Sequence, residues 1–298
     1  MVKQQNFLLL FKKFIASSKS GNRLKKDGTR IKKQSVDNYS YTERLLQEFV
    51  IMKTFDLVIY QIKGNSLRDH IKVKKYYMSF YKQFIIFLYK EKNCRDNYVG
   101  QTIRNIRTFY VWLNNEKCIV TGPYYKNFYI YKEDIPITTL SVKQLQFLAF
   151  DKDFETKLSA FLKRTKDIFV FGCIVGLRFS DLISIRNMNI ENLDGNYYLK
   201  VRSKKTGIDT LVKLPAYALE ILNKFSQKKK SLSILPQGYF LLPKKTFLFP
   251  HISLNSFNTN IKKMAELAGW TEPILRPKSK SGLATEKKRQ MLPDFVIQ

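Results

Sequence analysis

The spacing of large apolar side chains is the feature that most restricts the fold of this 298-residue chain. Up to residue 115 they recur every three or four positions, as on one face of an α-helix. This pattern predicts helices over residues 4–17, 35–52, 66–90 and from 96 onward. Ser35 and Ser66 are the expected N-caps, because a serine hydroxyl can accept a hydrogen bond from the first helical turn. Residues 18–33, rich in Gly, Ser and Lys, are expected to form a basic loop or arm.

The helical spacing disappears between residues 119 and 138. This segment contains Gly122, Pro123 and Pro136, which disfavour a continuous helix. We therefore expect a helical domain over residues 1–118, a linker over residues 119–138, and a second domain over residues 139–298.

The second domain is expected to combine helices with strands. Thr139 or Ser141 would open its first helix. Its helices are predicted over residues 142–150, 156–164, 167–176, 215–228 and 253–268. Segments rich in Tyr, Val and Leu predict strands, separated by a turn at residues 203–207, over residues 196–201 and 210–214. Residues 240–249 are expected to be extended, and residues 276–289 to form a basic loop followed by a short apolar piece, 291–297. The predicted fold class is mainly α with a small β-hairpin or sheet, an α+β second domain.

The balance of charged residues points to a polyanionic partner. Lysine and arginine total 53 against 24 aspartates and glutamates, which gives a formal net charge of +29. Such a charge speeds the encounter with polyanions through its long-range field. Nucleic acid is the leading candidate. The alternatives are a membrane surface, a ribosome-associated role, or a protein that is simply rich in lysine.

Other classes of protein fit the composition poorly. No segment reaches the ~20 consecutive apolar residues that a bilayer-spanning helix needs, so we expect no membrane association and a location in the cytoplasm or nucleoid. Cys94, Cys118 and Cys173 are far apart, and the chain has only two histidines. Neither a disulfide framework nor a metal site is therefore expected.

One helix carries a polar face typical of a helix that lies in a major groove. Opposite the apolar stripe of the helix from Asp96 stand hydrogen-bonding and basic side chains, with no acid before Glu116: Gln101, Arg104, Asn105, Arg107 and Thr108. Short polar side chains allow close approach to base edges, and arginines bind guanines and phosphates. Lys32 and Lys33, at the end of the basic arm, are further candidates for DNA contact. The alternative is a face that is merely solvated.

The segment from Gly176 to Leu182 places an arginine at the edge of a predicted core. Arg178 follows a glycine bend, and Asp181 stands three residues later. A cation there is costly unless it meets an anion, so Arg178 either binds a phosphate or forms a structural ion pair with Asp181. In the predicted hairpin turn, Lys205 could stabilise charge on a bound phosphate or donate a proton. Arg202 and Lys204 beside it add positive charge.

Together these motifs resemble the tyrosine recombinase (phage integrase) family. The family has a helical core-binding domain, a linker, and a catalytic domain with a Gly-Leu-Arg-x-x-Asp/Glu-Leu string and a hairpin lysine. Gly176–Leu182 and the Lys205-Thr206-Gly207 turn match these two motifs. The first half also resembles the core-binding domains of bacterial mobile-element integrases.

The resemblance implies a role for each residue of the two motifs. Arg178 would hold the scissile phosphate of double-stranded DNA, Lys205 would protonate the departing 5′-oxygen, and Asp181 would orient the arginine. It implies no metal and no cofactor.

The family's later motifs, a His-x-x-Arg helix and a nucleophilic tyrosine, are missing here. His251 has no arginine three residues on, and the tyrosines after Arg178 do not match the expected position: Tyr197, Tyr198, Tyr217 and Tyr239. With no nucleophile assigned, the polypeptide is expected to bind DNA but not to cleave it alone. It would act as a homo-oligomer on DNA or with a full-length recombinase. The alternatives are a non-catalytic regulator that occupies recombination sites and a non-specific RNA-binding protein.

Overall fold

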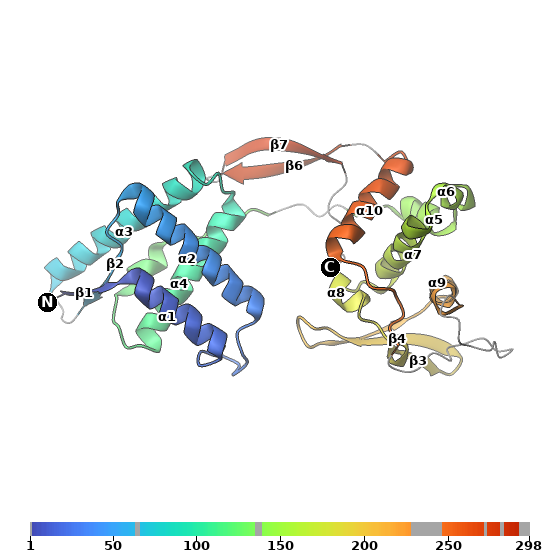
Figure 1. Cartoon of the computed structure of the whole chain (residues 1–298), viewed down its shortest axis with the longest axis horizontal. Coiled ribbons are helices and arrows are strands. Elements are labelled where there is room, and N and C mark those ends of the chain that lie inside the picture. The colour runs from blue at the N-terminus through green and yellow to red at the C-terminus, as the bar shows by residue number, and fades with distance from the viewer. Residues whose placement is uncertain are drawn as a thin grey trace. The chain divides into compact units, whose positions relative to one another are not determined.

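The computed structural model describes residues 2–62, 66–134, 139–227 and 246–270, together with the backbone of 273–280 and 283–291. The chain divides into two compact units (Figure 1). The first comprises Met1–Ile135 and Arg276–Lys288, and the second Pro136–Leu275 and Arg289–Gln298.

The first unit is built mainly of helices. Its elements are β1 (Val2–Asn6), α1 (Phe7–Ser20), α2 (Lys33–Lys53), β2 (Val58–Ile62), α3 (Leu67–Lys90), α4 (Asp96–Asn115) and the short 3-10 helix η1 (Pro123–Asn127). The predicted cap of α3 is confirmed, because the Ser66 side chain accepts a hydrogen bond from the Asp69 amide. The predicted start of α4 at Asp96 is confirmed too.

Two predicted helix starts were wrong. The first helix begins at Phe7 because the Asn6 side chain accepts a hydrogen bond from the Leu9 amide. The residues before it form β1, antiparallel to β2, a pairing over more than fifty positions that no local pattern reveals. Helix α2 begins at Lys33, ahead of the expected cap Ser35, and its N-cap Lys32 makes no side-chain capping bond.

Aromatic rings fill the core of the first unit. Phe11 and Phe14 of α1 pack edge-on against Phe109 and Trp112 of α4, with ring centroids 4.9 Å apart for Phe11–Phe109 and 5.5 Å apart for Phe14–Trp112. Each buried ring removes a large apolar area from water, so this cluster supplies much of the burial that holds α1 on α4.

Part of the predicted linker belongs to this core. Phe128 is fully buried and stacks on Tyr81 of α3 with ring centroids 5.1 Å apart. The Asn97 side chain donates to the Glu133 carbonyl (3.1 Å) and accepts from the Glu133 amide (2.9 Å). Extended and 3-10 segments lack the 3.6-residue period, which explains why this packing was not visible in the sequence.

The second unit combines helices with a three-stranded antiparallel sheet of order β3-β4-β5. Its elements are α5 (Val142–Phe150), α6 (Lys152–Lys157), α7 (Ala160–Val175), α8 (Phe179–Leu182), η2 (Asn187–Asn189), β3 (Ile190–Leu193), β4 (Asn196–Arg202), β5 (Asp209–Lys213), α9 (Ala216–Gln227) and α10 (Leu254–Leu267). Ser141 caps α5 with a capping box. The predicted hairpin is confirmed as β4 and β5.

Other predictions for the chain after residue 139 need correction. The helix expected over residues 156–164 is interrupted, because Ser159 caps α7 by accepting from the Leu162 amide. Residues 276–289 are not a loop, since β6 (Pro273–Lys280) pairs with β7 (Leu283–Met291). Strands rich in lysine show no apolar alternation, the usual strand signal. Residues 228, 240–245 and 292–297, for which helical, extended and apolar segments were predicted, lie outside the described residues.

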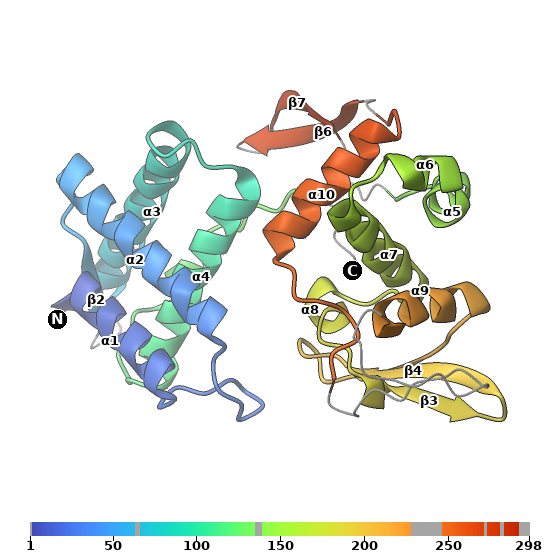
Figure 2. The ribbon, with the colours of Figure 1, turned by 45° about the vertical axis from the view of Figure 1, so that its right-hand side comes forward.

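The second unit has a core of its own. Helix α10 lies along α7 (Figure 2), and Asn260 donates to Thr165 between them at 2.9 Å. Trp270 follows α10 and packs on Phe147, with centroids 5.8 Å apart.

The charge cluster lies where α6, α7 and α9 meet. Lys166, 1% exposed, lies 3.0 Å from Glu155 and 3.2 Å from Asp167, and Lys224 approaches both acids. Burial tends to raise the pKa of Glu155, but the hydrogen bond and charge of Lys166 outweigh it and lower this pKa. These pairs tie α6, α7 and α9 together.

Gly100 gives a test of the close packing of α4. A Cβ there would lie 1.9 Å from the Tyr131 carbonyl oxygen. We expect Gly100→Ala to destabilise the first unit by about 1–3 kcal/mol, the usual cost of overpacking, measured by calorimetric unfolding. Alanine is otherwise the better helix former by ~1 kcal/mol, so a stabilised variant would contradict the contact. Gln101→Ala, on the same helical turn, is the control.

Candidate functional site

Arg178 stands where a buried helix ends. Helix α7 stops at Gly176, whose backbone is left-handed (φ +62°) and whose amide donates to the Gly172 carbonyl. Glycine adopts this conformation at little cost, which is why it ends helices so often. Leu177 then turns into the core, and Arg178 follows as the N-cap of α8, half-buried. The sequence thus places the guanidinium at the edge of the core, as the string predicted.

The Asp181 side chain contacts the hairpin turn, and not the Arg178 side chain. Its side chain is 2% exposed, and its Oδ1 accepts a hydrogen bond from the Lys204 backbone amide at 3.2 Å. Among the ion pairs of the described residues there is none between Arg178 and Asp181. The structural ion pair considered above is therefore absent, and so is the orienting contact that the resemblance implied.

The hairpin turn is closed by its own backbone. The Ser203 amide donates to the Ile208 carbonyl (2.9 Å), and the Gly207 amide donates to the Ser203 carbonyl (2.8 Å). Arg202 donates to the Gly207 carbonyl at 3.1 Å. Lys204 and Lys205 are exposed in this turn.

Contacts between the string and the turn bring the two predicted motifs together. The Arg178 guanidinium donates to Ser203 Oγ at 3.2 Å, and Lys204 Nζ donates to the Ser180 carbonyl at 3.3 Å. With the Asp181 bond, they join α8 to a turn more than twenty positions away. The Arg178 guanidinium and the Lys204 ammonium group thus lie in one region, with Lys205 the next residue of the turn. Cationic groups of this kind can bind the oxygens of a phosphate.

Sequence reasoning overlooked Ser203. Its side chain is 9% exposed, although it lies in a turn, and it contacts Arg178 directly. A small hydroxyl residue just before a pair of lysines was the only signal available.

The polar face of α4 divides into an inner and an outer part. Asn105 is 5% exposed and donates to Thr42 Oγ1 of α2 at 2.9 Å, so it cannot read bases as predicted. Arg107 donates to the Phe128 carbonyl at 3.4 Å, so part of its guanidinium is used in a structural hydrogen bond. The outer part keeps Gln101, Arg104 and Thr108, of which Arg104 donates to Gln101 Oε1 at 2.9 Å. Lys32 and Lys33 are exposed at the start of α2.

A hollow of about 520 Å³ lies beside this outer part, between α2 and the start of α4. Arginines and half-exposed tyrosines are among its lining residues: Tyr41, Arg44, Arg95 and Tyr98. Arg44 lies 5.3 Å from the Tyr41 ring centroid. Neighbouring aromatic and basic side chains are typical of nucleic-acid surfaces, and sequence reasoning did not single these out.

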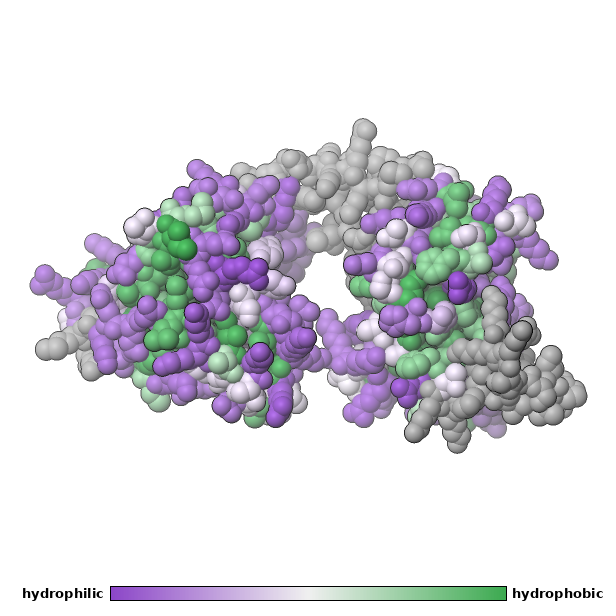
Figure 3. Space-filling model, in the orientation of Figure 1, coloured by the Kyte–Doolittle hydropathy of each residue, from purple (hydrophilic) through white to green (hydrophobic). Residues whose placement is uncertain are grey.

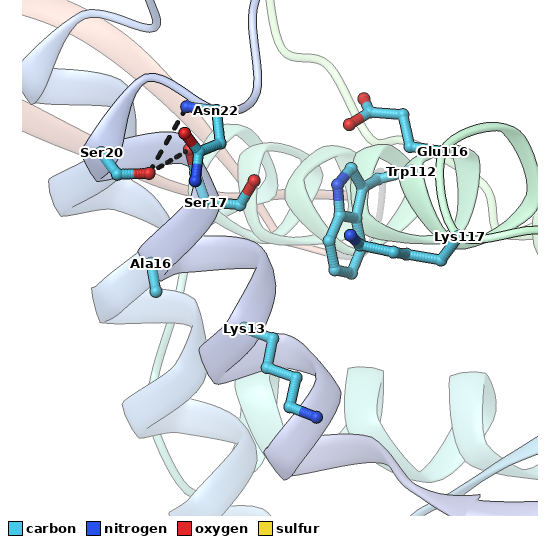
Figure 4. A pocket seen from close by; sticks show the side chains of 8 residues that line it. All are labelled: Lys13, Ala16, Ser17, Ser20, Asn22, Trp112, Glu116 and Lys117. Atoms are coloured by element: carbon cyan, nitrogen blue, oxygen red, sulfur yellow. Dashed lines mark hydrogen bonds between the residues drawn. The ribbon is translucent and has the colours of Figure 1, made fainter.

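A second hollow, of about 500 Å³, lies where α1 and α4 both end (Figure 4). Lys13 and Lys117 border it, with Lys117 over the Trp112 ring at 5.3 Å, and Glu116 faces the same space. The C-terminal ends of two helices carry partial negative charge, which disfavours a phosphate. The α2–α4 hollow also contains an acid, Glu48, but three basic residues line it as well: Arg44, Lys92 and Arg95. The α2–α4 side is therefore the better candidate for DNA contact.

Two kinds of site do not occur in the described part of the chain. None of its helices has the length and apolar character needed to cross a membrane. Its His, Cys, Asp and Glu residues nowhere form a group of three that could hold a metal ion. In the view of Figure 3, hydrophilic side chains cover much of the first unit, and hydrophobic and hydrophilic side chains are mixed on the second.

Comparison with known proteins shows a likeness of fold. No protein-family model matches the sequence, and no curated protein is similar to it. Solved structures do match. The XerH site-specific recombinase matches in a pre-cleavage complex with its difH substrate (TM-score 0.53, 11% identity, 88% of this chain and 79% of that chain) and in a post-cleavage complex (TM-score 0.56, 12% identity, 92% and 81%).

A lambda integrase tetramer bound to a Holliday junction also matches, with a TM-score of 0.53 and 12% identity. The match covers 88% of this chain but 65% of the integrase, so this chain spans just under two thirds of that protein. The chain has the fold of these recombinases, and the predicted fold class, mainly α with small antiparallel sheets, is confirmed.

Removing the Asp181 carboxylate tests its hold on the turn. Since hydrogen bonds to charged groups contribute about 1.5–3 kcal/mol, we expect Asp181→Ala to speed hydrogen exchange at the Lys204 amide at least about tenfold. Asp181→Asn, which keeps an acceptor, should change it less. Asp209→Ala, which removes an exposed carboxylate 4.0 Å from Arg202, is the control. Unchanged exchange in Asp181→Ala would show that the carboxylate does not hold the turn.

Proposed function

We propose that this chain is a DNA-binding member of the tyrosine recombinase family and acts on double-stranded DNA in site-specific recombination. The observation that carries the proposal is the junction of Arg178 and Asp181 with the Ser203–Lys204 turn, in a fold shared with DNA-bound recombinases. The net charge of +29 supports the same partner.

Within the second unit, Arg178 and the turn lysines bind one backbone phosphate. The guanidinium is a planar fork that fits two phosphate oxygens. Lys205 is the candidate proton donor for the departing 5′-oxygen, and Arg202 and Lys204 add charge beside it. Asp181 acts on this site through the turn that it holds.

The first unit binds the duplex through α2 and α4. On the predicted face Arg104 is exposed, while Gln101, Arg107 and Thr108 are half-buried. Lys32 and Lys33 add phosphate contacts. We assign residues 1–118 to a core-binding domain and residues 139–298 to a catalytic-type domain. Residues 119–134, which contain Phe128 and Glu133, pack on the first unit and belong with it. The chain works as a homo-oligomer on DNA or beside a full-length recombinase.

A matched pair of arginine variants tests the phosphate contact. Arg178→Ala should weaken binding to duplex DNA and lower the slope of log K against log salt by about 1, because one phosphate contact and its released counterion are lost. Arg164→Ala removes the same charge from a half-buried arginine that lies over Phe161, and should change both quantities less.

Three results would count against the proposal. Equal losses in the two variants would mean that net charge alone drives binding. Equal affinity for structured RNA and duplex DNA would favour the non-specific RNA-binding alternative. Unchanged affinity in Arg178→Ala, with tight DNA binding retained, would favour a regulator that binds through its first unit.

We infer further that this polypeptide binds DNA without cleaving it. No His-x-x-Arg string follows Lys205 in the sequence. Tyr198 lies in β4, and Tyr217 of α9 packs edge-on against Phe150 with centroids 5.8 Å apart. Without an assigned tyrosine nucleophile, charge and orientation alone do not supply the attack on the phosphate.

A nicked duplex gives the direct test of cleavage. Incubation with the purified 298-residue chain should yield no covalent protein–DNA adduct on a denaturing gel, under conditions where binding is saturated. An adduct that disappears on substitution of one tyrosine would overturn the inference and identify the nucleophile.

A further inference from the structure

Ser203 links the arginine to the hairpin, and we propose that it is a positioning residue for Arg178. The proposal rests on the DNA-binding function proposed above, to which it adds the group that orients the phosphate-binding guanidinium. The contact itself is the hydrogen bond from the guanidinium to Ser203 Oγ, 3.2 Å long.

The Ser203 hydroxyl has a defined position because its own backbone is fixed. The amide and the carbonyl of Ser203 both take part in closing the turn, with Ile208 and Gly207 as partners. The next residue, Lys204, is tied to Asp181 through its amide. The serine is 9% exposed in a turn whose following residues are exposed. Any displacement of the turn therefore moves the acceptor that Arg178 uses.

A hydroxyl orients a guanidinium without neutralising it. The nearby carboxylate, Asp181, is engaged with the Lys204 amide, and within the described residues Arg178 forms no ion pair. A carboxylate partner would compete with a phosphate for the same cation. A neutral acceptor takes one of the five N–H donors and keeps the full positive charge for the ligand.

Orientation before binding improves affinity. An arginine side chain has many rotamers, and ordering it when DNA binds costs conformational entropy. The bond to Ser203 orders the side chain in the unbound protein. It also couples Arg178 to Lys205, because both depend on the same turn.

A double-mutant cycle on duplex DNA binding tests the role of Ser203. We expect Ser203→Ala to weaken binding roughly two- to tenfold, the net worth of about one hydrogen bond, and to leave the salt slope unchanged because no charge is lost. In the Arg178→Ala background the same change should have no further effect. Ser203→Thr, which keeps the hydroxyl, should restore binding.

Two further variants separate positioning from stability and from charge. Ser184→Ala removes a hydroxyl that donates to the Asp181 carbonyl at 2.9 Å, in the same region but away from the guanidinium, and should leave affinity unchanged. Ser203→Asp supplies an acceptor that neutralises Arg178, so it should lower both the affinity and the salt slope. Thermal unfolding of each variant shows whether the second unit stays folded.

The outcomes distinguish the inference from the function on which it rests. If Arg178→Ala has no effect on affinity, the proposed phosphate site fails. If Arg178→Ala weakens binding while Ser203→Ala has no effect, or acts equally in the Arg178→Ala background, the site stands and the role of Ser203 is refuted.

Discussion

The cost of burying a carboxylate organises the second unit. Asp181 is almost fully buried, and a buried charge must find hydrogen-bond donors. The donor that meets it is the Lys204 amide, so the β4–β5 turn has to lie against α8. Once the turn is there, Ser203 reaches Arg178 and the turn lysines are presented beside it. A single requirement for solvation thus assembles residues from two distant parts of the sequence.

Charge is handled differently inside the protein and on its surface. Lys166, deep in the second unit, meets Glu155 and Asp167, and Lys224 completes the cluster. The excess of lysine and arginine lies outside, where water screens repulsion and a polyanion can use it. Arg178 is intermediate between the two, because it is half-buried but its partner, the Ser203 hydroxyl, is neutral. Such an arginine keeps its positive charge for binding an external anion.

Local signals were readable from the sequence, and distant partners were not. Ser66, Ser141 (one of two candidates), the apolar stripe of α4 and the β4–β5 hairpin were predicted correctly because each depends on neighbours within a few positions. The pairing of β1 with β2 was missed because its strands are far apart in the chain. Asn105 was misassigned because helical spacing shows a face but not what covers it, here Thr42. At the site, the string and the turn predicted from the sequence do meet, through Arg178 and Ser203, while the bond between Asp181 and the Lys204 amide required the fold.

The two tryptophans of the chain are divided between the compact units. Trp112 lies in the aromatic core of the first unit, and Trp270 packs on Phe147 in the second. Replacing either one by phenylalanine leaves a single indole fluorophore, whose emission reports on one unit alone. The order in which the units melt, and which of them senses a bound oligonucleotide, can therefore be followed by intrinsic fluorescence without attaching a dye.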